Sequence, residues 1–257
     1  MEPYYKSDWV TLYHGDYKNV LPFLPINSID LVLTDPPYGI NYQNKFTQSP
    51  HSSVNSDYHK FSYREWGQLA YNLLRNDTAL FAYTQWSVYG RHCTQLAKSG
   101  LLLKEPLIAQ KRLTGTGDLY GTFQTNTDWI IFAHKGRFLF KSTKLMYTKN
   151  PGHRSNRNEI PEFKTRFPSC WFGSDYPKST EAQASVKHLN HPTIKSVKFL
   201  SWLIQLTTYQ GQVVLDPFAG SGSTLVAAKT YRRFSIGIEI EERLCEMIAN
   251  RIERGSL

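Results

Sequence analysis

The sequence predicts a doubly wound α/β domain. Short apolar runs of strand length alternate along the chain with stretches in which apolar residues recur every three or four positions, which is the spacing of helices. Two of the apolar runs end in a carboxylate that is followed directly by proline, at Asp35 and at Asp216. Ligands of open α/β sheets bind at the carboxyl ends of the strands, so we expect both carboxylates at that edge.

The individual elements follow from these patterns. The run Ile29–Leu33 is typical of a buried strand, and the two prolines after Asp35 end it because neither donates a backbone N–H. Between Tyr63 and Leu74, apolar residues at helical spacing predict an amphipathic helix. The other strands are expected over residues 9–13, 78–83, 101–109, 128–133, 212–216 and 234–239. The other helices are expected over residues 18–24, 86–98, 193–207 and 241–254, with one more starting at 225–229.

Three stretches have no period. Residues 41–62 and 112–127 are polar loops, and the first begins so close to Tyr38 that we expect a lid or a loop ordered by substrate. Residues 137–188 are basic, rich in aromatic residues and broken by four prolines, so we expect an inserted module rather than core sheet. Residues 135–188 carry 11 Lys and Arg against 4 Asp and Glu, which is most of the net charge of +9. Such a block favours a polyanionic partner, most commonly nucleic acid.

Composition narrows the class of protein. Hydrophobic residues make up 40% of the 257 positions, as in globular proteins, which argues against a disordered chain. No apolar stretch is long enough to cross a bilayer and the start of the sequence lacks an apolar signal segment, so we expect a soluble, cytoplasmic protein that does not contact membranes. Cys93, Cys170 and Cys245 form no zinc spacing, so neutral thiols and no metal are expected.

A glycine-rich turn follows the second carboxylate. Residues 217–224 lie between a short apolar run and a helical stretch, and another apolar run ends at Glu239. Glycine lets a ligand approach the backbone, and a carboxylate about 20 residues further on can accept hydrogen bonds from ribose hydroxyls. The turn lacks the third glycine of the dinucleotide fingerprint, so these residues predict a nucleoside-containing ligand without identifying it.

Taken together, the motifs resemble the amino-group DNA methyltransferases, which methylate adenine N6 or cytosine N4 with S-adenosylmethionine. Asp35-Pro36-Pro37-Tyr38 resembles the catalytic motif of that family, and Asp216–Thr224 resembles its cofactor loop. Their order, with the catalytic motif first, is similar to the permuted class called beta. The resemblance implies a Rossmann-like methyltransferase sheet, mostly parallel with one antiparallel strand, plus a small basic insertion. One departure is Ser196, where the family usually has proline.

The resemblance also implies a set of site residues. The catalytic residues would be Asp35, Pro36, Pro37 and Tyr38, with Asp35 also beside the cofactor. The other cofactor residues would be Asp16, His191, Thr193, Lys195, Asp216, Pro217, Phe218, Ala219, Gly220, Ser221, Gly222, Ser223, Thr224 and Glu239. Residues 1–136 and 189–257 would form two halves of one domain, and residues 137–188 the target-recognition segment. The DNA-contact candidates there are Lys149, Arg154, Arg157, Lys164 and Arg166.

The chemistry of the motif leads to a functional hypothesis. Asp35 can accept a hydrogen bond from an exocyclic amino group, and Tyr38 can stack on a base that has been flipped out of the duplex. Aspartate at the first motif position is more typical of the adenine enzymes, so we expect an adenine-N6 DNA methyltransferase. The alternatives are cytosine-N4 methylation, methylation of RNA or protein glutamine on the same fold, and a non-enzymatic protein with a decayed fold. A homodimer and a cognate restriction enzyme are left open as partners.

Overall fold

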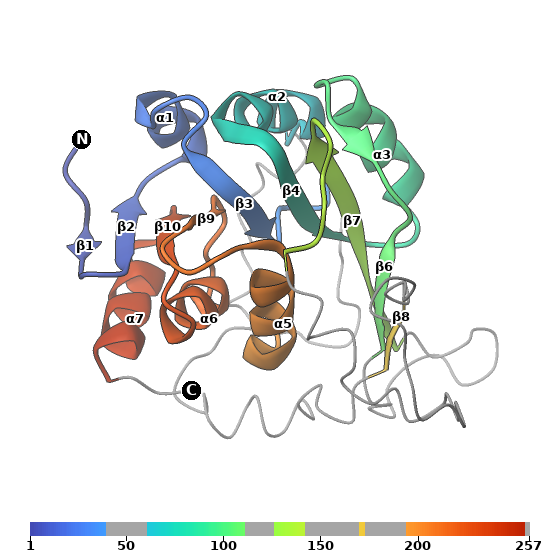
Figure 1. The fold of residues 1–257 in the computed structure, drawn as a ribbon. Helices are drawn as coiled ribbons and strands as arrows, with labels where there is room; N and C mark the ends of the chain where they lie inside the picture. Colours follow the sequence, from blue (N-terminus) through green and yellow to red (C-terminus); the bar gives the residue numbers. More distant parts are fainter. Residues whose placement is uncertain (40–60, 111–125, 142–169, 173–193, 255–257) are drawn as a thin grey trace, which may run out of the picture.

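A computed structural model describes residues 1–39, 61–110, 126–141, 170–172 and 194–254. In these residues one twisted sheet lies between two layers of helices, with α1, α2 and α3 on one face and α5, α6 and α7 on the other (Figure 1). The helices are α1 (Tyr17–Val20), α2 (Tyr63–Leu73), α3 (Tyr89–Ala97), α5 (Val197–Thr207), α6 (Ser223–Thr230) and α7 (Glu242–Glu253), with a 3-10 turn at Leu21–Phe23. The strands are β1 (Tyr5–Lys6), β2 (Val10–His14), β3 (Ile29–Thr34), β4 (Leu74–Thr84), β5 (Leu102–Leu103), β6 (Leu107–Gln110), β7 (Thr127–Lys135), β8 (Cys170–Phe172), β9 (Val213–Asp216) and β10 (Phe234–Glu239).

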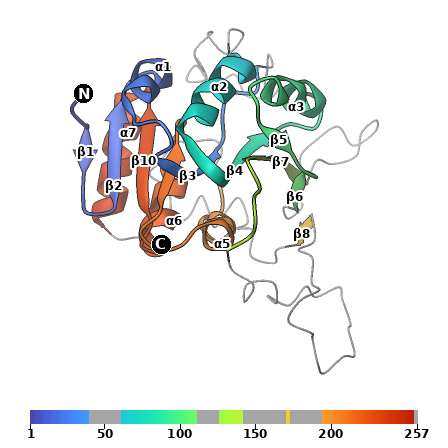
Figure 2. The ribbon, with the colours of Figure 1, turned by 45° about the horizontal axis from the view of Figure 1, so that its top comes forward.

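The order of the strands confirms the predicted fold class. They follow one another as β1-β2-β10-β9-β3-β4-β7-β6-β8, and Figure 2 shows this row from the edge at β1 to the edge at β8. The strands β2, β10, β9, β3 and β4 all run parallel. Strand β7 runs antiparallel between β4 and β6. The sheet is therefore mostly parallel, with an antiparallel strand in its second half.

The core consists of two apolar layers, one on each face of the sheet. Alternate residues of the central strands point to opposite faces. Val32 and Leu80 face the layer that contains Trp66 of α2, whereas Leu33 and Phe81 face the layer formed by α5 and α6. All of these side chains are at most 2% exposed. Burial on both faces explains why the central strands read in sequence as continuous apolar runs.

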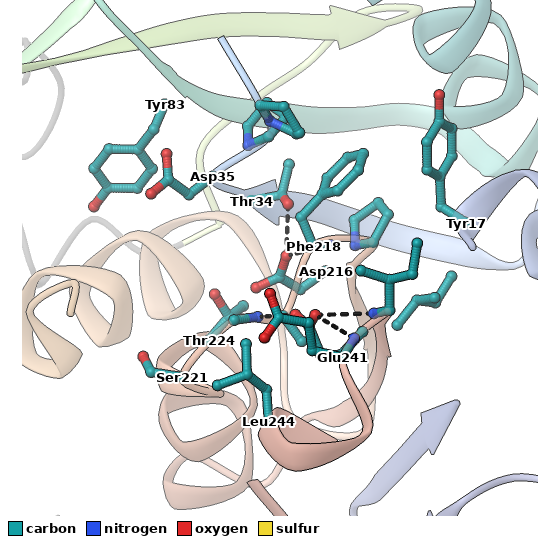
Figure 3. Close-up of a pocket in the computed structure, with 18 of the residues that line it drawn as sticks. Tyr17, Thr34, Asp35, Tyr83, Asp216, Phe218, Ser221, Thr224, Glu241 and Leu244 are labelled. Atoms are coloured by element: carbon teal, nitrogen blue, oxygen red, sulfur yellow. Dashed lines mark hydrogen bonds between the residues drawn. The ribbon is translucent and has the colours of Figure 1, made fainter. Parts of the chain in front are cut away.

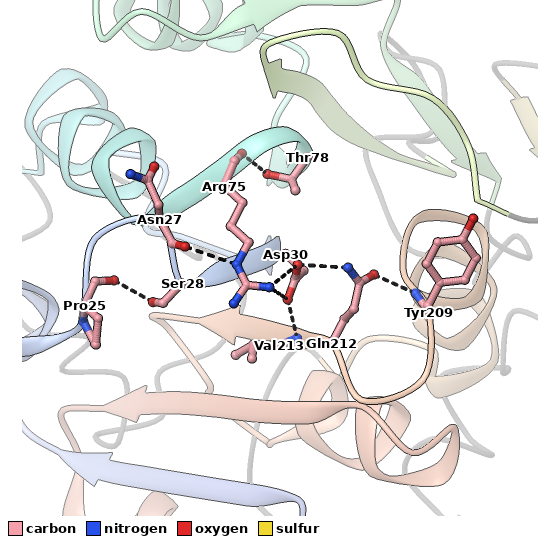
Figure 4. A network of polar contacts seen from close by, with 9 residues as sticks. All are labelled: Pro25, Asn27, Ser28, Asp30, Arg75, Thr78, Tyr209, Gln212 and Val213. Atoms are coloured by element: carbon pink, nitrogen blue, oxygen red, sulfur yellow. Dashed lines mark hydrogen bonds and ion pairs between the residues drawn. The ribbon is translucent and has the colours of Figure 1, made fainter.

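The connection between the two halves of the chain is made by β3 and β9. Leu31 and Val32 pair with Val214 and Leu215, which are more than 180 positions later. At the start of these strands, Asp30 receives hydrogen bonds from Arg75, from Gln212 Nε2 and from the backbone N–H of Val213 (Figure 4). Asp30 is only 3% exposed, so these contacts compensate its desolvation and fix the two halves to each other at the amino-terminal edge of the sheet.

Several expected boundaries were wrong. Residues 101–109 form two strands, β5 and β6, because Pro106 between them has no N–H to continue the pairing. Strand β8 lies in the basic segment that was expected outside the sheet, and it pairs in parallel with β6. The short β1 was not expected, and β4 begins at Leu74, directly after α2.

Two composition-based expectations concern the cysteines and membranes. All three cysteines are free thiols, and burial raises the pKa of Cys245 to about 12 and also raises the pKa of Cys93. Both are therefore neutral thiols, as predicted. In the part of the chain that the structure describes, no helix is both long and apolar enough to span a bilayer.

Candidate active site

The carboxyl ends of β3 and β9 meet where the direction of the chain changes. The helix after β3 covers one face of the sheet, and the helix after β9 covers the other (Figure 1). Such a switch point leaves a crevice between the two strand ends, and ligands of doubly wound sheets bind there. Thr34, the last residue of β3, donates a hydrogen bond to Asp216 Oδ1 across this crevice at 2.5 Å.

A cavity of about 610 Å³ opens at this position. Its volume lies in the range of about 300 to 1,000 Å³ that is typical of small-molecule sites. Figure 3 shows Thr34, Asp216 and Phe218 in the wall, with Asp35 and Tyr83 on one side and Tyr17 on the other. Both predicted motifs line the cavity, the first through residues 35–38 and the second through residues 216–221, 223 and 224. The fold thus brings together segments that are nearly 180 residues apart in the chain.

Asp35 lies at the mouth of this cavity with both oxygens occupied. Tyr38 donates its hydroxyl to Asp35 Oδ1 at 2.6 Å, and Lys195 Nζ forms an ion pair with Asp35 Oδ2 at 2.9 Å. The side chain of Asp35 is 26% exposed, so a ligand can reach it. Burial and the neighbouring Asp35 raise the pKa of Tyr38 well above its usual value, so the phenol remains a neutral donor.

Lys195 was expected beside the cofactor, and it does line the cavity. Its direct partner in the structure is nevertheless the carboxylate of Asp35, while its ammonium also lies 4.5 Å from the centre of the Tyr83 ring. Burial alone would lower the pKa of Lys195, but the charges of Asp35 and Asp128 outweigh burial and raise it. The ammonium therefore stays charged in the folded protein.

Asp216 occupies the deepest part of the site. It is 3% exposed, and burial raises its pKa from 3.8 to about 6, although hydrogen bonds from Thr34, Thr224 and the Phe218 backbone oppose that rise. Both Thr34 Oγ1 and the Phe218 N–H donate to Oδ1. The carboxylate therefore fixes the start of the glycine-rich turn onto the end of β3.

The glycine-rich turn leads into α6. Gly222 precedes the helix with φ of +74°, a conformation that other residues rarely adopt, and a Cβ there would lie 3.0 Å from Ile248. Gly220 donates its N–H to Glu239 Oε2 at 2.7 Å. Only glycine fits position 222, which explains the composition of this turn.

Glu239 ends β10 and lines the same cavity. Its Oε1 accepts the backbone N–H groups of Ile240 and Glu241, and its Oε2 accepts that of Gly220. A carboxylate oxygen can accept two hydrogen bonds, so Oε2 retains one position for a ligand hydroxyl. Burial raises the pKa of Glu239. The backbone contacts thus hold the side chain in one orientation toward the cavity.

Aromatic side chains form the wall near α1. Tyr17 packs 4.9 Å from Phe218 between ring centres, and Phe61 packs 5.3 Å from Phe218. Asp16 accepts a hydrogen bond from the backbone N–H of Lys18, which caps α1, and it also borders the cavity. Its expected place near a cofactor adenine stays a prediction.

Sequence reasoning missed the support behind the catalytic motif. Arg91 of α3 donates to the backbone carbonyls of Tyr38 and Gly39, at 3.4 Å each. His92 stacks on Tyr63 with 3.6 Å between ring centres, and burial lowers its pKa to about 4, so it is neutral. No local pattern signals these contacts. Tyr83 was also missed, although its position at the end of a strand next to β3 could have indicated it.

Some predicted site residues lie outside the described residues. These are His191 and Thr193 of the cofactor set and the five DNA-contact candidates, Lys149, Arg154, Arg157, Lys164 and Arg166. The loop 41–62, expected to act as a lid, is described only from Phe61 onward, and most of loop 112–127 is likewise outside. Within the described residues, no group of three His, Cys, Asp or Glu side chains is arranged to hold a metal ion.

Comparisons with known proteins agree with this geometry. Residues 29–251 match the model of the N6_N4_Mtase family, which is described as DNA methylase. Type II methyltransferase M2.DpnII of Streptococcus pneumoniae is 27% identical over 265 residues, which cover 98% of this chain and 92% of that protein.

Two solved structures share the fold. The putative DNA modification methylase TTHA0409 of Thermus thermophilus, complexed with S-adenosyl-L-methionine, superposes with a TM-score of 0.64 at 22% identity and covers 95% of this chain and 93% of that one. The PvuII DNA methyltransferase, described as cytosine-N4-specific, superposes with a TM-score of 0.69 at 18% identity and covers 99% and 96%.

Proposed function

Because this chain belongs to the DNA methylase family, we propose that it is a site-specific DNA methyltransferase that methylates the exocyclic N6 of adenine. The observation that supports the proposal most strongly is the juxtaposition of Asp35 with the cavity that Asp216 and Glu239 line. One carboxylate is accessible at the mouth, and two are buried behind it. This arrangement suits a site that holds a nucleoside-containing methyl donor and receives a base from outside.

The cavity fits S-adenosylmethionine, which supplies the methyl group from its sulfonium centre. The free acceptor position of Glu239 Oε2 would take a ribose hydroxyl, and the wall formed by Tyr17, Phe61 and Phe218 would flank the adenine. The turn at Gly220 and Gly222 lets the ligand approach the backbone. All of these groups are preorganised by contacts within the protein.

The protein residues then act on the target base. An exocyclic amino nitrogen is a poor nucleophile because its lone pair is delocalised into the ring. A hydrogen bond from the amino group to Asp35, and a second to the Pro36 carbonyl, favours the tetrahedral nitrogen whose lone pair attacks the methyl carbon. Tyr38 would stack on the base, which must leave the duplex at a cost of about a few kcal/mol to reach the site.

Two observations bear on the choice of base. Aspartate at position 35 favours adenine, as in the adenine enzymes that the motif resembles. The structural likeness to the cytosine-N4-specific PvuII enzyme keeps cytosine-N4 as the second candidate. The basic segment 137–188 is proposed to bind the DNA around the target.

The experiment is methyl transfer to unmodified DNA, followed by mass spectrometry of the nucleosides. We expect N6-methyldeoxyadenosine from the wild-type protein and none from Asp35→Ala, which should still bind S-adenosylmethionine in calorimetry. N4-methyldeoxycytidine would replace the adenine assignment, and methylated RNA in a parallel reaction would redirect the substrate class. Absence of any methylated nucleoside while the cofactor binds would contradict an enzymatic role.

A further inference from the structure

We propose that Lys195 is the positioning residue for the catalytic carboxylate: it holds Asp35 Oδ2, so that Asp35 Oδ1 is the oxygen that receives the amino group of the target base. This inference rests on the proposed function. It assigns different roles to the two oxygens of Asp35.

The first step of the argument is that Lys195 is held in place. Its ammonium lies 2.9 Å from Asp35 Oδ2 and is only 14% exposed at the side chain. The ring of Tyr83 lies beneath it at 4.5 Å, a favourable cation–π distance. The next residue, Ser196, caps α5 through a hydrogen bond from the Phe199 N–H, so the backbone that carries Lys195 is fixed as well.

The second step compares the two partners of Asp35. The Lys195 contact is charge-assisted, whereas the hydroxyl of Tyr38 is a neutral donor to Oδ1. Charge-assisted hydrogen bonds are roughly twice as strong as neutral ones. An incoming amino group therefore displaces Tyr38 more easily than Lys195. The displaced Tyr38 is then free to turn its ring to the base.

The third step concerns charge. Several titratable groups face Asp35, and among the described ones only Lys195 and the more distant Arg91 are cationic. Asp216 of β9 and Asp128 of β7 are acidic, while Tyr38, Tyr63, Tyr83 and His92 are neutral. Without Lys195, Asp35 would stand among carboxylates and would take up a proton more readily. A protonated Asp35 has lost an acceptor, so Lys195 also keeps the carboxylate in its working form.

The test uses Lys195→Met, which keeps the length of the side chain without its charge, and Lys195→Arg as the matched control. Methyl transfer is measured against pH at saturating cofactor and DNA, and cofactor affinity is measured separately by calorimetry. For the methionine variant we expect a kcat about 10- to 100-fold lower near neutral pH. We also expect the acidic limb of its pH profile to move upward by about 1 pH unit or more. Arginine should restore most of both, and cofactor affinity should change by less than kcat.

The contrasting variant is Tyr38→Phe, which keeps the ring but removes the competing donor to Oδ1. We expect it to lower the KM for DNA by about five-fold, because the base no longer displaces a hydrogen bond.

Each other outcome has a distinct meaning. If the methionine variant loses cofactor affinity but keeps its kcat and pH profile at saturation, Lys195 is a cofactor ligand and the inference is wrong. If Tyr38→Phe loses as much kcat as Lys195→Met, the roles of the two oxygens are not separated as proposed. Wild-type protein that binds cofactor but transfers no methyl group to DNA would overturn the proposed function and this inference with it.

Discussion

Replacing Asp216 by asparagine should remove a pH-dependent loss of stability that the wild-type protein undergoes near neutral pH. Asp216 is buried, and its pKa is raised from 3.8 to about 6 in the folded state. The folded protein therefore prefers the protonated carboxyl. The stability that this group contributes is complete below about pH 3.8 and is lost as the pH rises through about 6.

The magnitude follows from the difference between the two pKa values. A difference of about 2 corresponds to about 3 kcal/mol of unfolding free energy, and about 2 kcal/mol of this falls between about pH 4.5 and pH 7.5. Asparagine retains an oxygen for the two donors at Oδ1, Thr34 and the Phe218 N–H, but it cannot ionise. The substitution itself can add a constant cost, so the prediction concerns the change of the difference with pH.

The assay is urea unfolding of both proteins, monitored by tryptophan fluorescence at several pH values in this window. The free energy of the asparagine variant minus that of the wild type should rise with pH by about 2 kcal/mol. Other titrating groups contribute equally to both proteins and cancel in the difference. A difference that is flat, or that falls as the pH rises, would refute the reasoning that burial dominates at Asp216.

Three further predictions concern other parts of the molecule. Asp30→Ala should lower the unfolding free energy by about 3 to 5 kcal/mol in urea titrations, because it leaves Arg75 and Gln212 without their buried partner, but cofactor affinity should be retained since Asp30 is at the opposite edge of the sheet. Gly222→Ala should destabilise the protein by about 1 to 3 kcal/mol and weaken cofactor binding in calorimetry, whereas Gly211→Ala, with a similar φ but open space around its Cβ, should leave cofactor binding unchanged. Neutralising basic residues of segment 137–188 should reduce the salt dependence of DNA binding by about 0.9 per lost phosphate contact, and an unchanged slope would place the DNA elsewhere; the residues to replace are Lys149, Arg154, Arg157, Lys164 and Arg166.

The features that sequence predicted well depend on local patterns. Prolines after Asp35 and Asp216 end the strands, and apolar runs identify the strands that precede them. The position of both carboxylates at one edge then follows from the general rule for α/β sheets. The α/β fold and the meeting of the two motifs at one cavity were therefore predictable.

The features that sequence missed depend on tertiary contacts. The pairing of Lys195 with Asp35 joins residues 160 positions apart, and no spacing rule connects them. Strand β8 has only three residues and is defined by its partner β6 rather than by a period of its own. Arg91 reaches the backbone of Tyr38, and backbone acceptors leave no trace in the sequence. Such contacts have to be seen in three dimensions.

The chain leaves the core after Lys141 and re-enters it at Ile194 immediately before α5, and these two points are linked because the Lys141 N–H bonds to the carbonyl of Leu206 in α5. The ends of the basic segment are thus attached to the same part of the core. A segment of another length or sequence could be joined at this point without moving Asp35 or the glycine-rich turn. Exchange of segments between relatives would then alter which DNA sequence is read while the methyl-transfer site is inherited unchanged.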